Sequence, residues 1–247
     1  MFIRLITLAL LSFAIMGGGA RAGSAPPVRR DSPDALVQLG RKLMPTPLAQ
    51  LMEHRERELL QGFHQSGDTK DLEEARQRLR QTQADLIRIL AGTPSFDEVV
   101  FRFGLLARRV CEMNTFRHYA SDAQEAARLE TFERLATAKR SRFVPVFYDY
   151  SPLLFKDPLP EQYWDQTVAR NRGLSARIAQ RYQDGAGAVL FDDRSPAFGL
   201  ASLHFSHTIT DIANAWLFCW RESNGDMDGV PFFPYPRSPR PNHGVSP

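Results

Sequence analysis

The chain has 247 residues, of which 43% are hydrophobic and 24% are charged. Lysine and arginine number 31 against 28 aspartates and glutamates, which gives a net charge of +3 with both signs mixed along the sequence. This length suits one substantial hydrophobic core, and so small a charge excess excludes the strongly basic footprint of a dedicated nucleic-acid-binding domain.

The N-terminal segment has the pattern of a secretory signal peptide. Arg4 gives it a charged start, residues 5–16 form a short apolar core, and residues 20–22 read Ala-Arg-Ala, an A-x-A cleavage site. The apolar core is too short to span a membrane comfortably, and no later segment has the required apolar length. We therefore predict a signal peptide over 1–22 and a periplasmic or extracellular mature protein that begins near Gly23, without a transmembrane span. The alternative is that the segment is retained as a membrane anchor.

Hydrophobic periodicity and capping residues predict helices over most of the remaining chain. The expected helices cover 47–63, 72–90, a segment that starts after Ser95, 122–139, 160–182 and 200–221. Ser95 and Glu98 form a predicted capping box, and residues 143–155, rich in aromatic side chains and interrupted by prolines, are expected to form an ordered loop. Because no alternating strand pattern of useful length appears, we predict an all-α fold. A single multi-helix domain would cover 23–228, followed by a proline-rich tail over 229–247.

The last predicted helix is apolar on most of its surface but carries one polar stripe. The stripe occupies positions i, i+3, i+7 and i+10, which share one narrow face: His204, His207, Asp211 and Asn214. A helix that is hydrophobic on its other faces belongs inside a domain, so we expect the stripe to be buried as well. Buried polar groups need partners, and imidazole next to carboxylate suits metal binding or proton transfer.

Two cysteines, Cys111 and Cys219, lie in predicted helices among apolar neighbours. They are either buried free thiols or, if the two helices pack side by side, a disulfide. Neither cysteine has the spacing of a metal ligand.

The predicted helix after Ser95 and its exit contain, in order, Phe103-Gly104, Glu112, Asn114 and His118. This spacing resembles the central helix of the zinc-dependent phospholipase C family and of the related single-strand-specific zinc nucleases. The family pattern is a Leu-Gly pair followed by His-x-x-x-Asp-x-x-Gln-Pro-x-His. Glu112 takes the position of the aspartate, and His118 takes the position of the last histidine. The resemblance implies a multi-helix domain of the phospholipase C type.

The resemblance extends over most of the mature chain. Gly62 and Asp68 resemble the segment that supplies an aspartate bridging two zinc ions, and Phe132-Glu133 resembles the pair that closes the family's next ligand motif. Residues 210–218 resemble the family's final helix, which contains a tryptophan flanked by apolar residues. These matches imply that Asp68 and Glu133 are further members of a metal site.

Several of the family's ligands are replaced in this chain. Arg108 stands at the first histidine of the central helix, Leu129 at the histidine before the downstream glutamate, and Thr115-Phe116 at the Gln-Pro pair. No tryptophan stands at the mature N-terminus either. Arginine cannot bind zinc because it stays protonated and has no lone pair to donate. The family's complete three-zinc cluster is therefore not expected.

Arg108 has two interpretations. It lies four residues before Glu112 on a helix predicted to be buried, so the two side chains can form an ion pair that neutralises the carboxylate without a metal. The alternative is that Arg108 binds phosphate or stabilises a transition state.

The stripe on the last helix also has two interpretations. Its spacing suits a mononuclear metal site built from His204, His207 and Asp211 and completed by Glu112 or His118. The alternative is a hydrogen-bonded polar seam in which Asp211 orients His207.

The resemblance implies a hydrolase in which one or two zinc ions activate water against a phosphodiester of a lipid head group, a nucleic acid or the cell envelope. The predicted catalytic residues are Glu112, Asp211 and Arg108. The predicted metal ligands are His118, His207, His204, Glu112, Asp211, Asp68 and Glu133. The alternative is a catalytically degenerate relative without zinc that acts as a binding or structural protein of the cell envelope, and the third hypothesis is a helical scaffold without a site. The sequence leaves the oligomeric state open.

Overall fold

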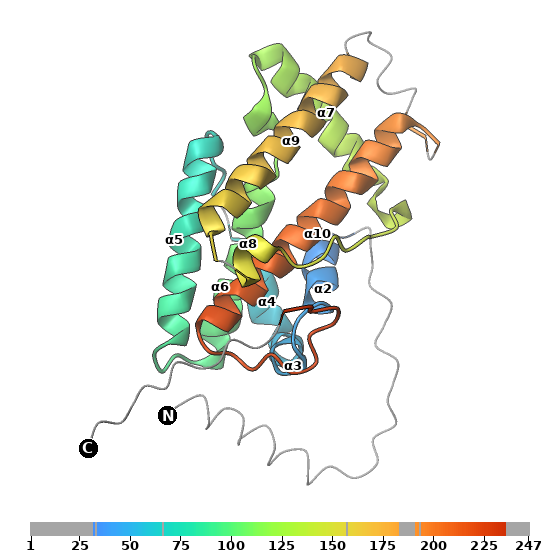
Figure 1. The fold of residues 1–247 in the computed structure, drawn as a ribbon. Coiled ribbons are helices and arrows are strands. Elements are labelled where there is room, and N and C mark those ends of the chain that lie inside the picture. The colour runs from blue at the N-terminus through green and yellow to red at the C-terminus, as the bar shows by residue number, and fades with distance from the viewer. Residues whose placement is uncertain are drawn as a thin grey trace, which may run out of the picture.

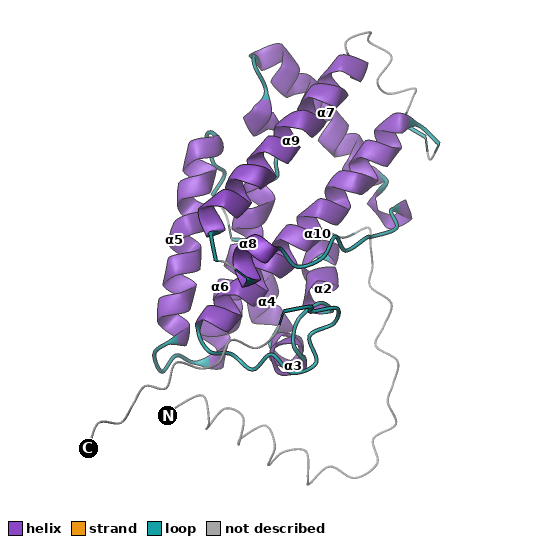
Figure 2. Cartoon of the chain, in the orientation of Figure 1, coloured by secondary structure: helices purple, strands orange, loops and turns teal. Residues whose placement is uncertain are grey.

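The computed structural model describes residues 32, 34–65, 67–156, 158–182, 191–192 and 194–235. The predicted signal peptide and the end of the predicted tail lie outside these ranges. Within them every regular element is a helix, which confirms the all-α prediction (Figures 1 and 2). The elements, in chain order, are α2 (Ala35–Arg41), α3 (Thr46–His54), α4 (Glu56–Phe63), α5 (Leu72–Leu90), α6 (Phe96–Met113), η1 (Phe116–Tyr119), α7 (Ala123–Ala138), η2 (Arg140–Arg142), α8 (Pro152–Phe155), α9 (Pro160–Tyr182) and α10 (Pro196–Glu222).

Helices α5, α6 and α7 begin at side-chain caps of the same kind. Before α5, α6 and α7, the oxygen of Asp71, Ser95 or Asp122 accepts a hydrogen bond from the backbone N–H three residues later. The capping box predicted at Ser95 is only half formed, because the Glu98 carboxylate bonds to Arg102 Nε at 2.7 Å. These caps explain why the three helices start within one residue of their predicted positions.

Three elements differ from the prediction. The helix expected over 47–63 is two helices, α3 and α4, which meet at Arg55, where a φ of −121° breaks the helical path. α2 was not predicted, because a helix of 7 residues leaves too short a periodic pattern. α10 starts at Pro196, four residues before its predicted start, since Ser195 caps it by accepting the Phe198 N–H at 3.1 Å.

α10 is the central helix of the fold. It runs diagonally beside α9 in Figure 1 and packs against α2, α5, α6, α7, α8 and α9. All residues from 208 to 220 are buried, and Trp216 donates its Nε1–H to the Phe103 carbonyl of α6 at 2.7 Å. Across the part of the chain that the structure describes, no helix combines the length and apolarity needed to cross a membrane.

α4 and α6 cross at a pair of glycines. A Cβ atom added to Gly62 would lie 2.0 Å from the Phe101 carbonyl oxygen, and one added to Gly104 would lie 2.0 Å from that of Leu59. The backbones therefore approach closely only because both residues lack a side chain. This contact holds α6, which carries several of the predicted site residues, against the N-terminal helices.

The loop over 143–151 lies along α10. Ser206, Thr210 and Asn214, spaced one helical turn apart, accept hydrogen bonds at 2.8–3.1 Å from backbone N–H groups of this loop. The predicted ordered loop is therefore confirmed up to α8, where Ser151 caps one short helical turn. α10 thus carries a second polar row beside the predicted stripe, and Asn214 belongs to both.

The first residues of the predicted tail are attached to the domain. Phe233 packs edge-on against Tyr150 and Phe155, with ring centroids 5.4 Å and 5.3 Å apart. Tyr235 donates its hydroxyl to the Tyr150 carbonyl at 3.1 Å. The aromatic side chains of this segment therefore extend the core cluster, while 236–247 lie outside the described residues.

Both cysteines are free thiols, so the disulfide alternative is wrong. Cys219 is buried in α10, and Cys111 is partly buried in α6. Burial raises the pKa of Cys111 to about 12, and it raises that of Cys219 as well. Both thiols therefore stay protonated at neutral pH.

Candidate functional site

Asp211, in the middle of α10, is fully buried and accepts hydrogen bonds at both carboxylate oxygens. Oδ1 accepts from the Tyr163 hydroxyl at 2.8 Å and from Arg170 Nη1 at 3.3 Å. Oδ2 accepts from Arg170 Nη2 at 2.6 Å and from Asn114 Nδ2 at 3.0 Å. Burial by itself would lower the pKa of Arg170, but the charge of Asp211 raises it above its ordinary value. Both oxygens of the Asp211 carboxylate therefore have their hydrogen-bond donors within the protein.

The Asp211 cluster joins the end of α6 to α9 and α10. Asn171 Nδ2 donates to Asn114 Oδ1 at 2.6 Å, and both side chains are buried. Tyr163, Arg170 and Asn171 all come from one face of α9, at positions i, i+7 and i+8. The sequence analysis missed these three residues. Their polar side chains recur at helical spacing close to Trp164 and Leu174, which are buried. This recurrence could have indicated that the polar side chains are buried as well.

Glu112 forms a second cluster of carboxylate and guanidinium groups on α6. Arg108 Nε donates to Oε1 at 3.0 Å, which confirms the predicted ion pair. Arg109 Nη1, which was not predicted, bonds to both oxygens at 2.9 Å and 2.8 Å. Arg108 Nη2 also donates to Asp68 Oδ1 at 3.2 Å. The side chain of Arg108 is 32% exposed, so the contact between Arg108 and Asp68 lies at the rim of the core.

The predicted histidines are neutral and have ring partners or weak polar contacts. Burial, together with the positive charge of Arg170, lowers the pKa of His204 to about 3 and that of His207 to about 4. The His204 ring packs at a tilt against Phe116 with centroids 4.0 Å apart, and His207 stacks on Tyr148 at 4.3 Å. The hypothesis that Asp211 orients His207 is wrong, because both oxygens of Asp211 are bonded to other donors.

His118 lies in η1, just after α6. Its Nε2 is 3.3 Å from Thr69 Oγ1, and its Nδ1 is buried without a hydrogen-bond partner. Burial lowers the pKa of His118, and the charge of Arg117 adds to the effect. This imidazole is therefore a neutral group between α6 and the segment before α5.

The predicted ligands do not fit a zinc ion. Zinc needs three or four donors with free lone pairs, but the carboxylates of Asp211, Glu112 and Asp68 each face a guanidinium group. Within the described ranges, no group of three or more His, Cys, Asp and Glu side chains is arranged to hold a metal. Most of the predicted residues are instead divided among the Asp211 cluster, the Glu112 cluster and a cavity next to them. The other two, His118 and His207, contact Thr69 and Tyr148.

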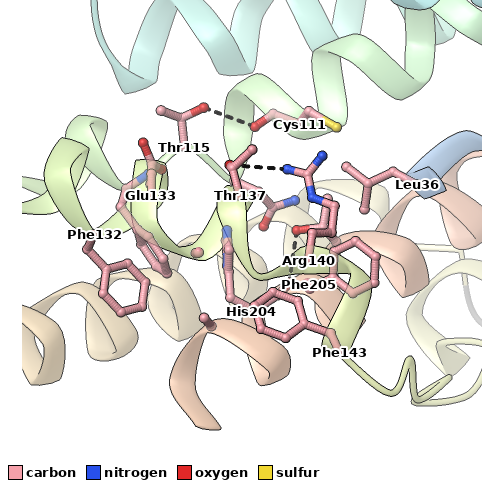
Figure 3. Close-up of a pocket in the computed structure, with 15 residues that line it drawn as sticks. Leu36, Cys111, Thr115, Phe132, Glu133, Thr137, Arg140, Phe143, His204 and Phe205 are labelled. Atoms are coloured by element: carbon pink, nitrogen blue, oxygen red, sulfur yellow. Dashed lines mark hydrogen bonds between the residues drawn. The ribbon is translucent and has the colours of Figure 1, made fainter. Parts of the chain in front are cut away.

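This cavity, of about 240 Å³, lies between the end of α6, α7, η2 and α10 (Figure 3). Two of the predicted residues, Glu133 and His204, line it together with Arg140 and Thr137. Figure 3 shows the His204 ring pointing up between Glu133 on one side and Arg140 on the other. The remaining walls are largely aromatic and aliphatic: Leu36, Phe116, Phe132, Ala136, Phe143, Ala201 and Phe205.

Glu133 is the acidic group of the cavity. Its Oε1 accepts the Phe116 N–H at 2.6 Å, which fixes η1 against α7. Burial raises the pKa of Glu133 to about 7, and this effect outweighs the hydrogen bond and the charge of Arg117, which lower it. The side chain therefore changes protonation state near neutral pH.

Comparisons with protein families, with curated proteins and with solved structures found no match. The resemblance to the zinc-dependent phospholipase C family accordingly stays a prediction made from the motifs of this sequence. The fold is established as all-helical over the described residues.

Proposed function

We propose that this protein is a non-catalytic relative of the zinc-dependent phosphodiester hydrolases that acts by binding rather than by hydrolysis, in the periplasm or the extracellular space. The observation that carries the proposal is the bond between Arg170 and Asp211, in which one guanidinium group engages both oxygens of a fully buried carboxylate. Bidentate pairs of this kind use the lone pairs that a metal would need.

The second cluster supports the same conclusion. A zinc ion at Glu112 would have to displace Arg108 and Arg109, and its double positive charge would then meet two guanidinium groups at close range. A guanidinium group keeps its positive charge throughout the physiological pH range, so a change of pH does not relieve this kind of repulsion. The carboxylates of the two clusters therefore form ion pairs with arginines and do not serve as metal ligands.

The proposal is tested by metal content and by hydrolysis. The purified protein is incubated with excess zinc, dialysed and examined by elemental analysis, and hydrolysis of bis(p-nitrophenyl) phosphate is followed in parallel. We expect far less than one zinc per chain and no hydrolysis above the rate without protein. Either about one zinc per chain that survives dialysis, or hydrolysis that a chelator abolishes, would overturn the proposal.

A pair of variants tests the same proposal by measuring the stability of the protein. Arg170→Met leaves Asp211 buried without its counter-charge, so we expect a loss of about 3–5 kcal/mol in the free energy of unfolding measured with urea. Arg172→Met removes the same charge from an exposed position of α9 and should change the stability by less than about 0.5 kcal/mol. Equal stabilities of the two variants would contradict the role assigned to Arg170.

A further inference from the structure

We infer that the cavity between α6, α7, η2 and α10 binds a small organic carboxylate with a compact apolar body. The inference rests on the proposed function in one respect, because both assume that this protein acts by binding rather than by hydrolysis. It concerns a different set of side chains from the two arginine–carboxylate clusters.

Arg140 supplies the cation. It begins η2, directly after the C-terminal end of α7, where a positive charge is favoured by the helix dipole. Its guanidinium group lies over the Phe205 ring, 5.8 Å from the centroid, and its Nη2 is 3.5 Å from Thr137 Oγ1. Among the described residues no carboxylate forms an ion pair with Arg140, and burial lowers its pKa. A partly buried guanidinium without a counter-charge is a suitable partner for an anion.

The other polar groups favour a single carboxylate over a more highly charged anion. His204 is neutral, and its Nδ1 is buried without a hydrogen-bond partner. Glu133 lies on the far side of the His204 ring from Arg140 and becomes negative as the pH rises through neutrality. One positive charge therefore faces the cavity, which matches a monoanion and disfavours a dianion such as phosphate.

The walls and the volume define the rest of the ligand. Most of the lining beyond Arg140, His204 and Glu133 is apolar, with Leu36, Ala136 and Phe205 among it, and an inorganic anion would leave this surface without an apolar contact. The cavity has a volume of about 240 Å³, which suits a small ligand. A molecule the size of benzoate matches this description, with its carboxylate at Arg140 and its ring against the apolar lining.

Isothermal titration calorimetry of the full-length protein tests the inference with matched probes. Benzoate is the test ligand, benzamide is its neutral analogue, acetate keeps the carboxylate without the apolar body, and inorganic phosphate is the competing anion. We expect benzoate to bind at least about tenfold more tightly than each of the other three probes. Benzamide lacks the charge-assisted hydrogen bond to Arg140, and acetate and phosphate lack the apolar contact.

Variants locate the site. Arg140→Gln should weaken benzoate binding at least about tenfold, and Arg140→Lys should weaken it less. Arg134→Gln removes the same charge from an exposed position of α7 and should leave benzoate binding unchanged.

Three results would each overturn the inference: benzamide or phosphate binding as tightly as benzoate, no detectable benzoate binding, or unchanged benzoate binding in Arg140→Gln. If Arg140→Gln does not fold, as judged by circular dichroism, the ligand series on the unaltered protein still decides. Absence of benzoate binding in a protein that also carries no zinc would refute this site and leave the proposed function standing.

Discussion

At the scale of single residues, Glu133 couples protonation to folding. Burial raises the pKa of its carboxyl group from 4.5 to about 7 in the folded protein. Between these two values the folded protein holds a proton that the unfolded chain has released, so the contribution of Glu133 to stability is lost as the pH rises through this window. Above pH 7 the buried carboxylate is charged and its full cost is present. His204 and His207 have lowered pKa values, so their protonation in the unfolded chain favours unfolding as the pH falls below 6.5.

Glu133→Gln should therefore stabilise the protein at pH 8 and leave its stability nearly unchanged at pH 4.5. The glutamine still accepts the Phe116 N–H but carries no charge, so we expect a gain of about 1–3 kcal/mol in the free energy of unfolding at pH 8. Urea unfolding at the two pH values measures it, and subtracting the wild-type value at each pH cancels the contribution of the histidines. Glu130→Gln, at an exposed position of the same helix, is the control and should show no such pH dependence. An equal gain at both pH values would contradict the raised pKa.

At the scale of elements, the contact between α4 and α6 depends on two missing side chains. Gly62 and Gly104 face each other's helix backbone, and a Cβ atom on either would lie 2.0 Å from a carbonyl oxygen. Backbone atoms cannot give way as a flexible side chain does, so the helices would have to separate. α6 carries both Arg108 and Glu112, and a shift of this helix would also move Asn114 away from Asp211.

Gly62→Ala and Gly104→Ala should each destabilise the protein by about 1–3 kcal/mol or more, although alanine favours helices more than glycine does. Gly173→Ala is the matched control, because a Cβ atom at this exposed position of α9 meets nothing within 4 Å. We expect that variant to be neutral or stabilised by up to about 1 kcal/mol. Thermal unfolding followed by circular dichroism compares the three. A stable Gly104→Ala variant would show that the helices can separate at little cost.

At the scale of the whole molecule, one helix organises the fold. α10 packs against six other helices, and one core cluster extends from α2 to the aromatic residues of the tail segment. The predicted signal peptide precedes all of this core, since the first helix of the described chain begins at Ala35. Removal of residues 1–22 would therefore take away none of the core contacts described here.

Expression in a bacterium with a secretion system, followed by intact-mass and N-terminal analysis of the periplasmic fraction, tests the predicted processing. We expect a mature chain that starts at Gly23. Ala22→Pro or replacement of Leu10 by Arg should block cleavage, because the first alters the cleavage site and the second interrupts the apolar core. A full-length chain that stays in the cytoplasm would refute both the signal peptide and the proposed location.

Several features of the candidate site could be predicted because they are local. Arg108 and Glu112 form their ion pair because residues four apart on a helix are neighbours. The burial of Asp211 and Asn214 follows from the apolar residues around them on the same helix. The partners of Asp211 could not be predicted in the same way, because Arg170 is 41 residues away along the chain and only the packing of α9 against α10 brings them together.

The sequence alone determined the helical fold class, the caps of α5, α6 and α7, and the burial of Asp211 and Asn214 on α10, where the other stripe residues, His204 and His207, are half-buried. Each of these features depends on residues within a few helical turns. Tertiary structure alone decided that Arg170 neutralises Asp211, that two glycines allow α4 and α6 to touch, and that Arg140 and His204 line one cavity. A buried carboxylate is paired with whichever donors the packing of the helices brings within hydrogen-bonding distance. The pattern of residues along one helix does not show which donors those are.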